Sequence, residues 1–158
     1  MTRFKFVHRL AVATAAATLF GSAAFAGDTQ NMTVQANVIG TCKLVTVPLL
    51  DFGTLNQVTA PAVNPAAVNV TYRCTKNTAP TSFTVGASNT GAFTGSLSNG
   101  TDTIAYGITW TAPVTGGSGL GTGVTPVNVA LTGSIAATVY QNVSAGTYTQ
   151  SVAIVIAP

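Results

Sequence analysis

The sequence predicts an all-β fold, an antiparallel sandwich of seven or eight short strands. Runs in which apolar and polar residues alternate recur along the chain, and turn residues separate them. Outside residues 1–26, no segment of useful length shows the 3.6-residue apolar period of an amphipathic helix. Two cysteines, Cys42 and Cys74, suit a crosslink between strands of an exported domain.

Residues 1–26 have the three-part layout of a secretory signal peptide. Three basic residues precede an apolar, Ala-rich stretch from Leu10 to Phe20, and Ala24-Phe25-Ala26 is a small-x-small cleavage signature. The apolar stretch is about 11 residues long, whereas a helix needs roughly 20 to span a bilayer. We expect cleavage after Ala26 and export of residues 27–158; an uncleaved anchor is the alternative.

The first alternating stretch of the exported part runs from Asn31 to Cys42. Four residues on one face, Met32, Val34, Ala36 and Val38, alternate with Thr33, Gln35 and Asn37. This period of two is typical of a half-buried strand. The pattern leaves open whether the strand joins the sheet of its own domain or that of another copy.

The remaining strands are expected in the following order. They lie at Lys43–Leu50 with a break at Pro48, and then at residues 68–74, 83–85, 104–110, 127–131, 135–139 and 147–156. Residues 56–66 and 112–123 are expected to be loops, and residues 86–101 an exposed hairpin or a long loop. Strand parity places Phe83, Tyr106 and Trp110 in the core rather than on a sugar-binding surface. So many short strands in about 130 residues indicate an immunoglobulin-like sandwich.

Cys42 and Cys74 are predicted to form a disulfide. Both lie in the exported part, and an even cysteine count in such a domain favours pairing. The bond closes a loop of about 33 residues, which stabilises the fold by roughly 3–4 kcal/mol on the chain-entropy estimate. A pair of free buried thiols is the alternative, and a metal site is disfavoured because no third Cys and no His can complete it.

The charge balance changes when the signal peptide is removed. The full chain carries a formal net charge of +3, but three of its six basic residues lie within residues 1–26. The exported part then has three basic and three acidic side chains and a net charge of zero. Binding to nucleic acid needs clustered Lys and Arg, so no nucleic-acid partner is expected.

The exported part also lacks the residues that most catalysis needs. Its sequence contains no Glu, and the only His, His8, lies in the signal peptide. Ser–His and Cys–His nucleophile pairs are therefore excluded, and paired-carboxylate chemistry would need two of three isolated Asp residues. The glycine-rich stretch at residues 116–121 lacks the Lys-Ser/Thr ending of a phosphate loop. We expect a protein that is not an enzyme and that has no metal and no other cofactor.

The final predicted strand, residues 147–156, raises the question of its outer edge. It ends two residues before the end of the sequence, and its apolar residues Val152, Ile154 and Ile156 share one face. An apolar strand with a free edge is an aggregation hazard. We therefore expect a partner strand to cover it.

Essentially the whole exported part resembles the spore coat protein U domain family, which includes pilin subunits of archaic chaperone–usher pili. The shared features are the alternating segment before Cys42, Leu50-Asp51-Phe52-Gly53, Val68 to Cys74-Thr75, Ile104-Ala105-Tyr106, Leu131-Thr132-Gly133-Ser134-Ile135, and Ala145-Gly146-Thr147-Tyr148-Thr149 followed by alternating aliphatics. The chain departs from the family at Gln150, where Asp is common, and at Leu120-Gly121, where Trp-Gly is common.

The resemblance implies an incomplete sandwich that lacks its last strand. A periplasmic chaperone lends a strand during export, and at the outer-membrane usher the N-terminal segment of the next subunit replaces it. The expected division is a signal peptide (1–26), a donor-strand segment (27–41) and a sandwich domain (42–158). The donor residues are Met32, Val34, Ala36 and Val38, and the acceptor groove is bordered by Val152, Ile154 and Ile156.

The function implied is that of a pilus subunit that polymerises head-to-tail and supports adhesion and biofilm formation. Its partners are other copies of itself or related pilins, the chaperone and the usher. Its location is the periplasm in transit and then the cell surface. The alternative is a monomeric secreted β-sandwich that binds a carbohydrate or a surface, with residues 32–38 as the first strand of a self-contained fold.

Overall fold

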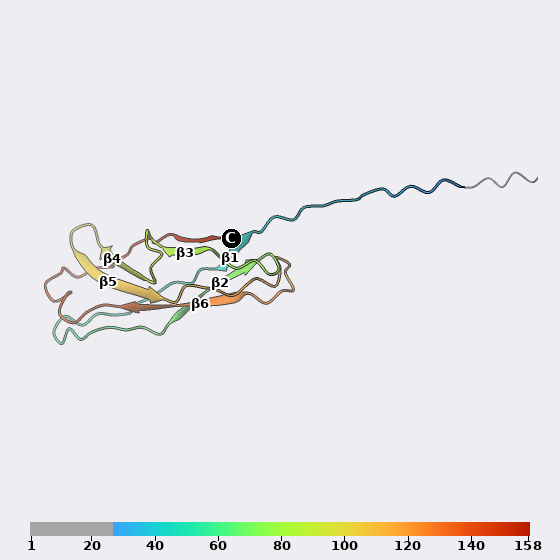
Figure 1. The fold of residues 1–158 in the computed structure, drawn as a ribbon. Helices are drawn as coiled ribbons and strands as arrows, with labels where there is room; N and C mark the ends of the chain where they lie inside the picture. Colours follow the sequence, from blue (N-terminus) through green and yellow to red (C-terminus); the bar gives the residue numbers. More distant parts are fainter. Residues whose placement is uncertain (1–26) are drawn as a thin grey trace, which may run out of the picture. The chain divides into compact units, whose positions relative to one another are not determined.

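The computed structural model describes residues 27–158, and the predicted signal peptide lies outside this range. The chain divides into two units, of which the second, residues 37–158, contains all seven strands. Figure 1 shows how the chain runs through this unit. Its strands are β1 (Cys42–Thr46), β2 (Val68–Cys74), β3 (Ser82–Val85), β4 (Ala92–Ser98), β5 (Thr103–Trp110), β6 (Val127–Ser134) and β7 (Ile154–Ala157).

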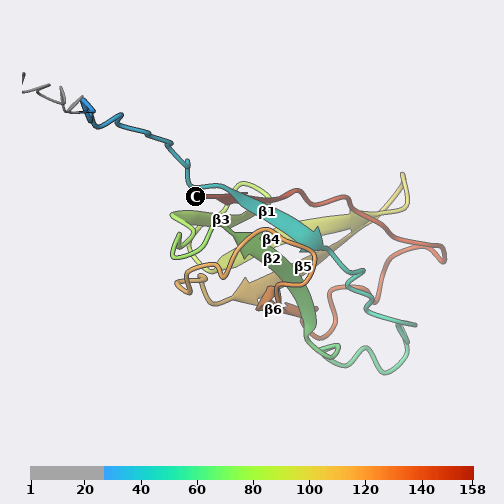
Figure 2. The ribbon, with the colours of Figure 1, turned by 90° about the vertical axis from the view of Figure 1, so that its right-hand side faces the viewer.

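The strands form two antiparallel sheets. The larger has the order β1-β2-β6-β5-β4, and the smaller pairs β3 with β7. Strands β1 and β7 belong to different sheets but lie side by side (Figure 2). Within residues 27–158, no helix is long and apolar enough to cross a membrane. The predicted all-β class with an antiparallel sandwich is therefore confirmed.

The core lies between the sheets and follows the alternation in the sequence. Strands β2 and β5 show it most clearly, with burial on every second residue. Both sheets contribute buried side chains: Val70, Tyr72, Cys74, Ile104, Tyr106, Ile108, Trp110, Val129 and Leu131 from the larger, and Phe83 and Val85 from the smaller. Phe83 and Trp110 pack edge to face, with ring centroids 6.3 Å apart. The three aromatic side chains expected in the core are buried there.

Strand β4 occupies residues 92–98, where the sequence predicts either an exposed hairpin or a long loop. It pairs with β5 along its whole length, so of the two alternatives expected for residues 86–101 the structure has the hairpin. Gly95 lies in the middle of β4, where a Cβ would be 2.8 Å from the ring of Tyr106 and 2.5 Å from Gln150 Oε1. The glycine that suggests a loop is therefore a close-packing position inside a strand.

Two predicted strands near the C-terminal end differ from the structure. The prediction of a strand at residues 135–139 is wrong: only Ile135 makes an isolated bridge, to Val63, and Thr138 has a φ of 70°. A positive φ is costly for a β-branched residue and ends the extended chain. The strand expected over residues 147–156 is confirmed only at β7, because residues 150–153 form no ladder.

The turn between β4 and β5 is fixed to a distant loop by Asp102. Its Oδ2 accepts hydrogen bonds from the hydroxyl of Ser144 and from the Ser144 N–H, the latter at 2.7 Å. Within the turn, Asn99 Oδ1 accepts from the N–H groups of Thr101 and Asp102. The Ser144 hydroxyl, and after it the Ser144 N–H, lower the pKa of Asp102 from its ordinary 3.8.

This lowered pKa predicts an acid-range loss of stability that depends on Asp102. Because the folded pKa lies below the unfolded value, the stabilisation is present above the unfolded pKa and is lost as the pH falls through the folded pKa. We expect Asp102→Asn to be less stable than wild type at pH 7, and the difference to shrink below pH ~4. Urea unfolding of both proteins at several pH values measures this, and a difference that is the same at all of them would contradict the assignment.

Candidate functional site

An apolar cavity of about 160 Å³ lies between the two sheets. Each strand from β2 to β7 contributes to its lining, as do the segment after β1 and the segment before β7. The lining residues are Val47, Pro48, Leu49, Leu50, Phe52, Val68, Val70, Val85, Leu97, Tyr106, Ile108, Leu131, Gln150, Val152 and Ile154. Gln150 is the only residue with a polar side chain among them apart from Tyr106, whose burial raises the pKa of its phenol above the ordinary 10.0. The cavity is therefore uncharged.

One wall of the cavity is β7 with the residues that lead into it. Val152 and Ile154 are half-buried and line the cavity, whereas Ala153 between them and Val155 after them are exposed. Strand β7 pairs with β3 on one edge, and within the described residues no strand pairs with its other edge. Strand β1 lies beside β7 without pairing with it, so the backbone groups on that edge have no ladder partner.

The opposite wall is the segment that follows β1. Leu44, Pro48 and Leu50 are half-buried, whereas Val45, Val47 and Leu49 are exposed by 43%, 52% and 81%. The period-two alternation of a strand thus continues beyond Thr46, where pairing with β2 ends after a register shift between Leu44 and Thr46. Residues 47–52 have no ladder partner. Both walls of the cavity therefore alternate like strands and have an edge without a ladder partner.

The predicted site residues fall into three groups. Val152 and Ile154 line the cavity, whereas Ile156 is half-buried opposite Phe83 in the β3–β7 ladder and is not part of the lining. The predicted donor residues lie in a stretch, residues 27–41, that contains no strand. Their side chains are exposed: Met32 by 84%, Val34 by 81% and Val38 by 79%, with Ala36 exposed as well. The alternation of residues 32–38 is therefore not used in a strand of the isolated chain.

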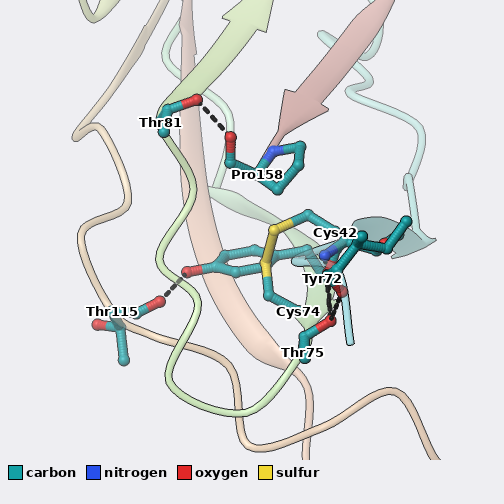
Figure 3. Close-up of a disulfide and its surroundings, with 9 residues drawn as sticks. Cys42, Tyr72, Cys74, Thr75, Thr81, Thr115 and Pro158 are labelled. Carbon is teal, nitrogen blue, oxygen red and sulfur yellow. Dashed lines mark hydrogen bonds between the residues drawn. A yellow bond between two sulfur atoms is a disulfide. The ribbon is translucent and has the colours of Figure 1, made fainter. Parts of the chain in front are cut away.

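The predicted disulfide between Cys42 and Cys74 is present (Figure 3). It joins the first residue of β1 to the last residue of β2, which face each other in the ladder. Cys74 is fully buried.

Sequence reasoning missed residues 47–52 as a wall of the site. The signal is present in the alternation of residues 44–50, but Pro48 predicts a break in that strand. A proline lacks an N–H and is tolerated in a strand that has no pairing neighbour at that position.

Within residues 27–158, no group of three or more His, Cys, Asp or Glu side chains could hold a metal ion. The site offers apolar surface and free strand edges, and it can bind an extended peptide.

Gly133 determines how closely the wall of residues 47–52 packs against β6. It is a buried residue of β6, and a Cβ there would be 2.9 Å from Leu50 Cδ2 and 3.0 Å from the ring of Phe52. We expect Gly133→Ala to push both side chains outward and to lower the free energy of unfolding by about 1–3 kcal/mol, as overpacking does. Gly123→Ala is the matched control, since its Cβ would meet nothing within 4 Å. Urea unfolding compares the two, and equal effects would contradict the packing argument.

The family model of the Spore Coat Protein U domain matches residues 28–155. Searches of curated proteins and of solved structures found no match to the chain. The family match includes residues 32–38, both walls of the cavity and both cysteines. The chain therefore belongs to the Spore Coat Protein U domain family.

Proposed function

We propose that the chain is a structural subunit of a chaperone–usher surface pilus and polymerises head-to-tail by donor-strand complementation. The N-terminal segment of one copy enters the cavity of the next and runs between residues 47–52 and β7. The observation that carries this proposal is the pair of cavity walls, each of which alternates like a strand and has an edge without a ladder partner. A strand between them would pair with both and would complete the sandwich.

The donor segment matches the cavity in chemistry and in spacing. Met32, Val34, Ala36 and Val38 recur every second residue, which is about 6.8 Å in a strand, and so do Val152 and Ile154. Residues 29–41 contain no charged side chain, and neither does the cavity lining. Burial of the donor therefore removes apolar surface from water without desolvating a charge.

The same free edge explains the partners that the family suggests. A strand from a periplasmic chaperone would occupy the cavity during export, and an outer-membrane usher would catalyse its exchange for the donor segment of another subunit. Because donor and acceptor are different surfaces of one chain, each contact leaves a free donor and a free acceptor, so the assembly grows as a fibre. The role is adhesion and biofilm formation at the cell surface, with no catalytic step, no cofactor and no nucleic acid.

The proposal is tested by deleting residues 27–38. The deletion removes the donor but keeps the cavity, so we expect the variant to bind the chaperone as wild type does and to form no polymer. Electron microscopy of subunits released from the chaperone measures this. Polymers that form normally from the deletion variant would contradict the proposal.

Size-exclusion chromatography of residues 27–158 separates the pilus subunit from a self-contained binding module. A subunit with an open cavity should elute as a defined species only with a co-expressed chaperone and should aggregate or polymerise without it. A protein that refolds alone to a stable monomer would favour the monomeric module instead.

A further inference from the structure

The N-terminal segment is attached to the sandwich at a doubly fixed point. Thr41 donates its N–H to Thr75 Oγ1 at 3.0 Å, and the N–H of Thr75 donates to the carbonyl of Thr41 at 2.9 Å. The Thr75 hydroxyl also lies within 3.3 Å of the Thr41 carbonyl and 3.5 Å of the Ile39 carbonyl. The next residue, Cys42, is covalently joined to Cys74. The chain is therefore held to the end of β2 from residue 39 onward.

The end of β2 is itself held by the loop of residues 115–119. Gly119 donates its N–H to the Cys74 carbonyl at 3.0 Å. Tyr72 donates its hydroxyl to the Thr115 carbonyl at 3.0 Å, as Figure 3 shows. Gly117 packs so closely that a Cβ there would lie 2.1 Å from the Cys74 carbonyl oxygen. Strand β2 also has a neighbour on both edges. Cys74 is therefore a rigid anchor within the larger sheet.

Strand β1 is a weak connection by comparison. It is a five-residue strand at the edge of the sheet, it pairs only with β2, and its register shifts between Leu44 and Thr46. It continues directly into residues 47–52, which form one wall of the cavity. Without the covalent bond, tension applied before Cys42 would pass along β1 into that wall.

We infer that the Cys42–Cys74 bond has a mechanical function: it diverts tension on the donor segment into β2 and protects the acceptor cavity of the same subunit. The inference rests on the proposed function, since only in a fibre does one subunit carry tension at both its donor segment and its cavity. Hydrogen bonds of Thr41 and Thr75 set the direction in which the chain leaves the anchor, while the disulfide carries the tension. The bond thus lies between the donor segment, which ends at Thr41, and the cavity wall, which begins at Val47, only six residues further along the chain.

The test stretches single fibres in an optical trap before and after reduction with a water-soluble phosphine. Reduction follows assembly, so export and folding take place with the disulfide intact, and thiol labelling verifies it. At constant tension, we expect reduction to shorten the lifetime of the donor–cavity contact at least tenfold. Without tension, the lifetime should change far less.

The control is a fibre of Val129→Ala, which removes two methyl groups from the core of β6. Val129 is buried and does not line the cavity. The variant should lower the stability in denaturant without the tenfold loss of lifetime under tension. If it reproduces the tenfold loss, the disulfide acts only through general stability and the inference is overturned.

Two further outcomes are decisive. Fibres whose lifetime under tension is the same before and after reduction would overturn the inference and leave the proposed function intact. Failure of the oxidised wild-type chain to form fibres would overturn the proposed function and the inference together.

Discussion

Polymers are expected to disappear when Val34 is replaced by Asp and to persist when Gln35 is replaced by Asp. Val34 shares the apolar face of the donor segment with Met32 and Ala36, whereas Gln35 lies on the opposite face. Insertion between the cavity walls would bury an unpaired carboxylate at position 34, in a lining that holds no charge. Such a burial costs about 3 kcal/mol or more, which is over a hundredfold in affinity. At position 35 the new carboxylate would remain in water.

The pair of variants is its own control, because both add one negative charge to adjacent positions of an exposed segment. Neither position contributes to the strands of the sandwich, so chaperone binding should be unchanged in both. Polymerisation of chaperone-released subunits, followed by electron microscopy, gives the readout. Equal loss in both variants, or equal persistence, would contradict the proposed orientation of the donor strand.

Alternation predicted the strands that pack against the core on one face. For β2 and β5 it gave both the bounds and the buried residues to within a residue, because each strand has one face in the core. It failed where alternation and backbone geometry disagree. Residues 135–139 alternate, but the positive φ of Thr138 turns the chain, and nothing in the side-chain pattern reports a φ value. Strand β4 was obscured by Gly95, which is needed for packing beneath Tyr106.

The candidate site was predictable only in part, since alternation identifies the buried face of a strand but not its neighbour. Val152 and Ile154 were placed correctly on an inward face. Residues 47–52 were missed as the facing wall, because their approach to β7 is a contact between residues about 100 positions apart in sequence. Residues 32–38 show the same limit: their alternation indicates a strand, and the isolated chain contains no partner for it. A pattern that the chain does not use by itself is what a segment that folds in another copy would show.

Loss of the disulfide is expected to be the largest single effect on the stability of the subunit. Cys42 and Cys74 are 32 positions apart, and release of such a loop costs about 3–4 kcal/mol on the chain-entropy estimate. The suitable protein lacks residues 27–38 and is saturated with the synthetic peptide of that sequence, so that it cannot polymerise. With a urea slope of about 1.5 kcal/mol per molar, reduction should lower the unfolding midpoint by about 2 M.

Two comparisons separate the crosslink from the packing of its atoms. Cys74 is fully buried, so a Cys42→Ala/Cys74→Ala variant loses both the bond and side-chain contacts, whereas reduction of the wild-type protein loses only the bond. The double variant should therefore be less stable than the reduced wild type by a further ~1 kcal/mol or more. A midpoint that moves by less than about 0.5 M on reduction would mean that the loop of residues 43–73 remains ordered in the unfolded chain, because the entropy term acts only on a loop that reduction sets free.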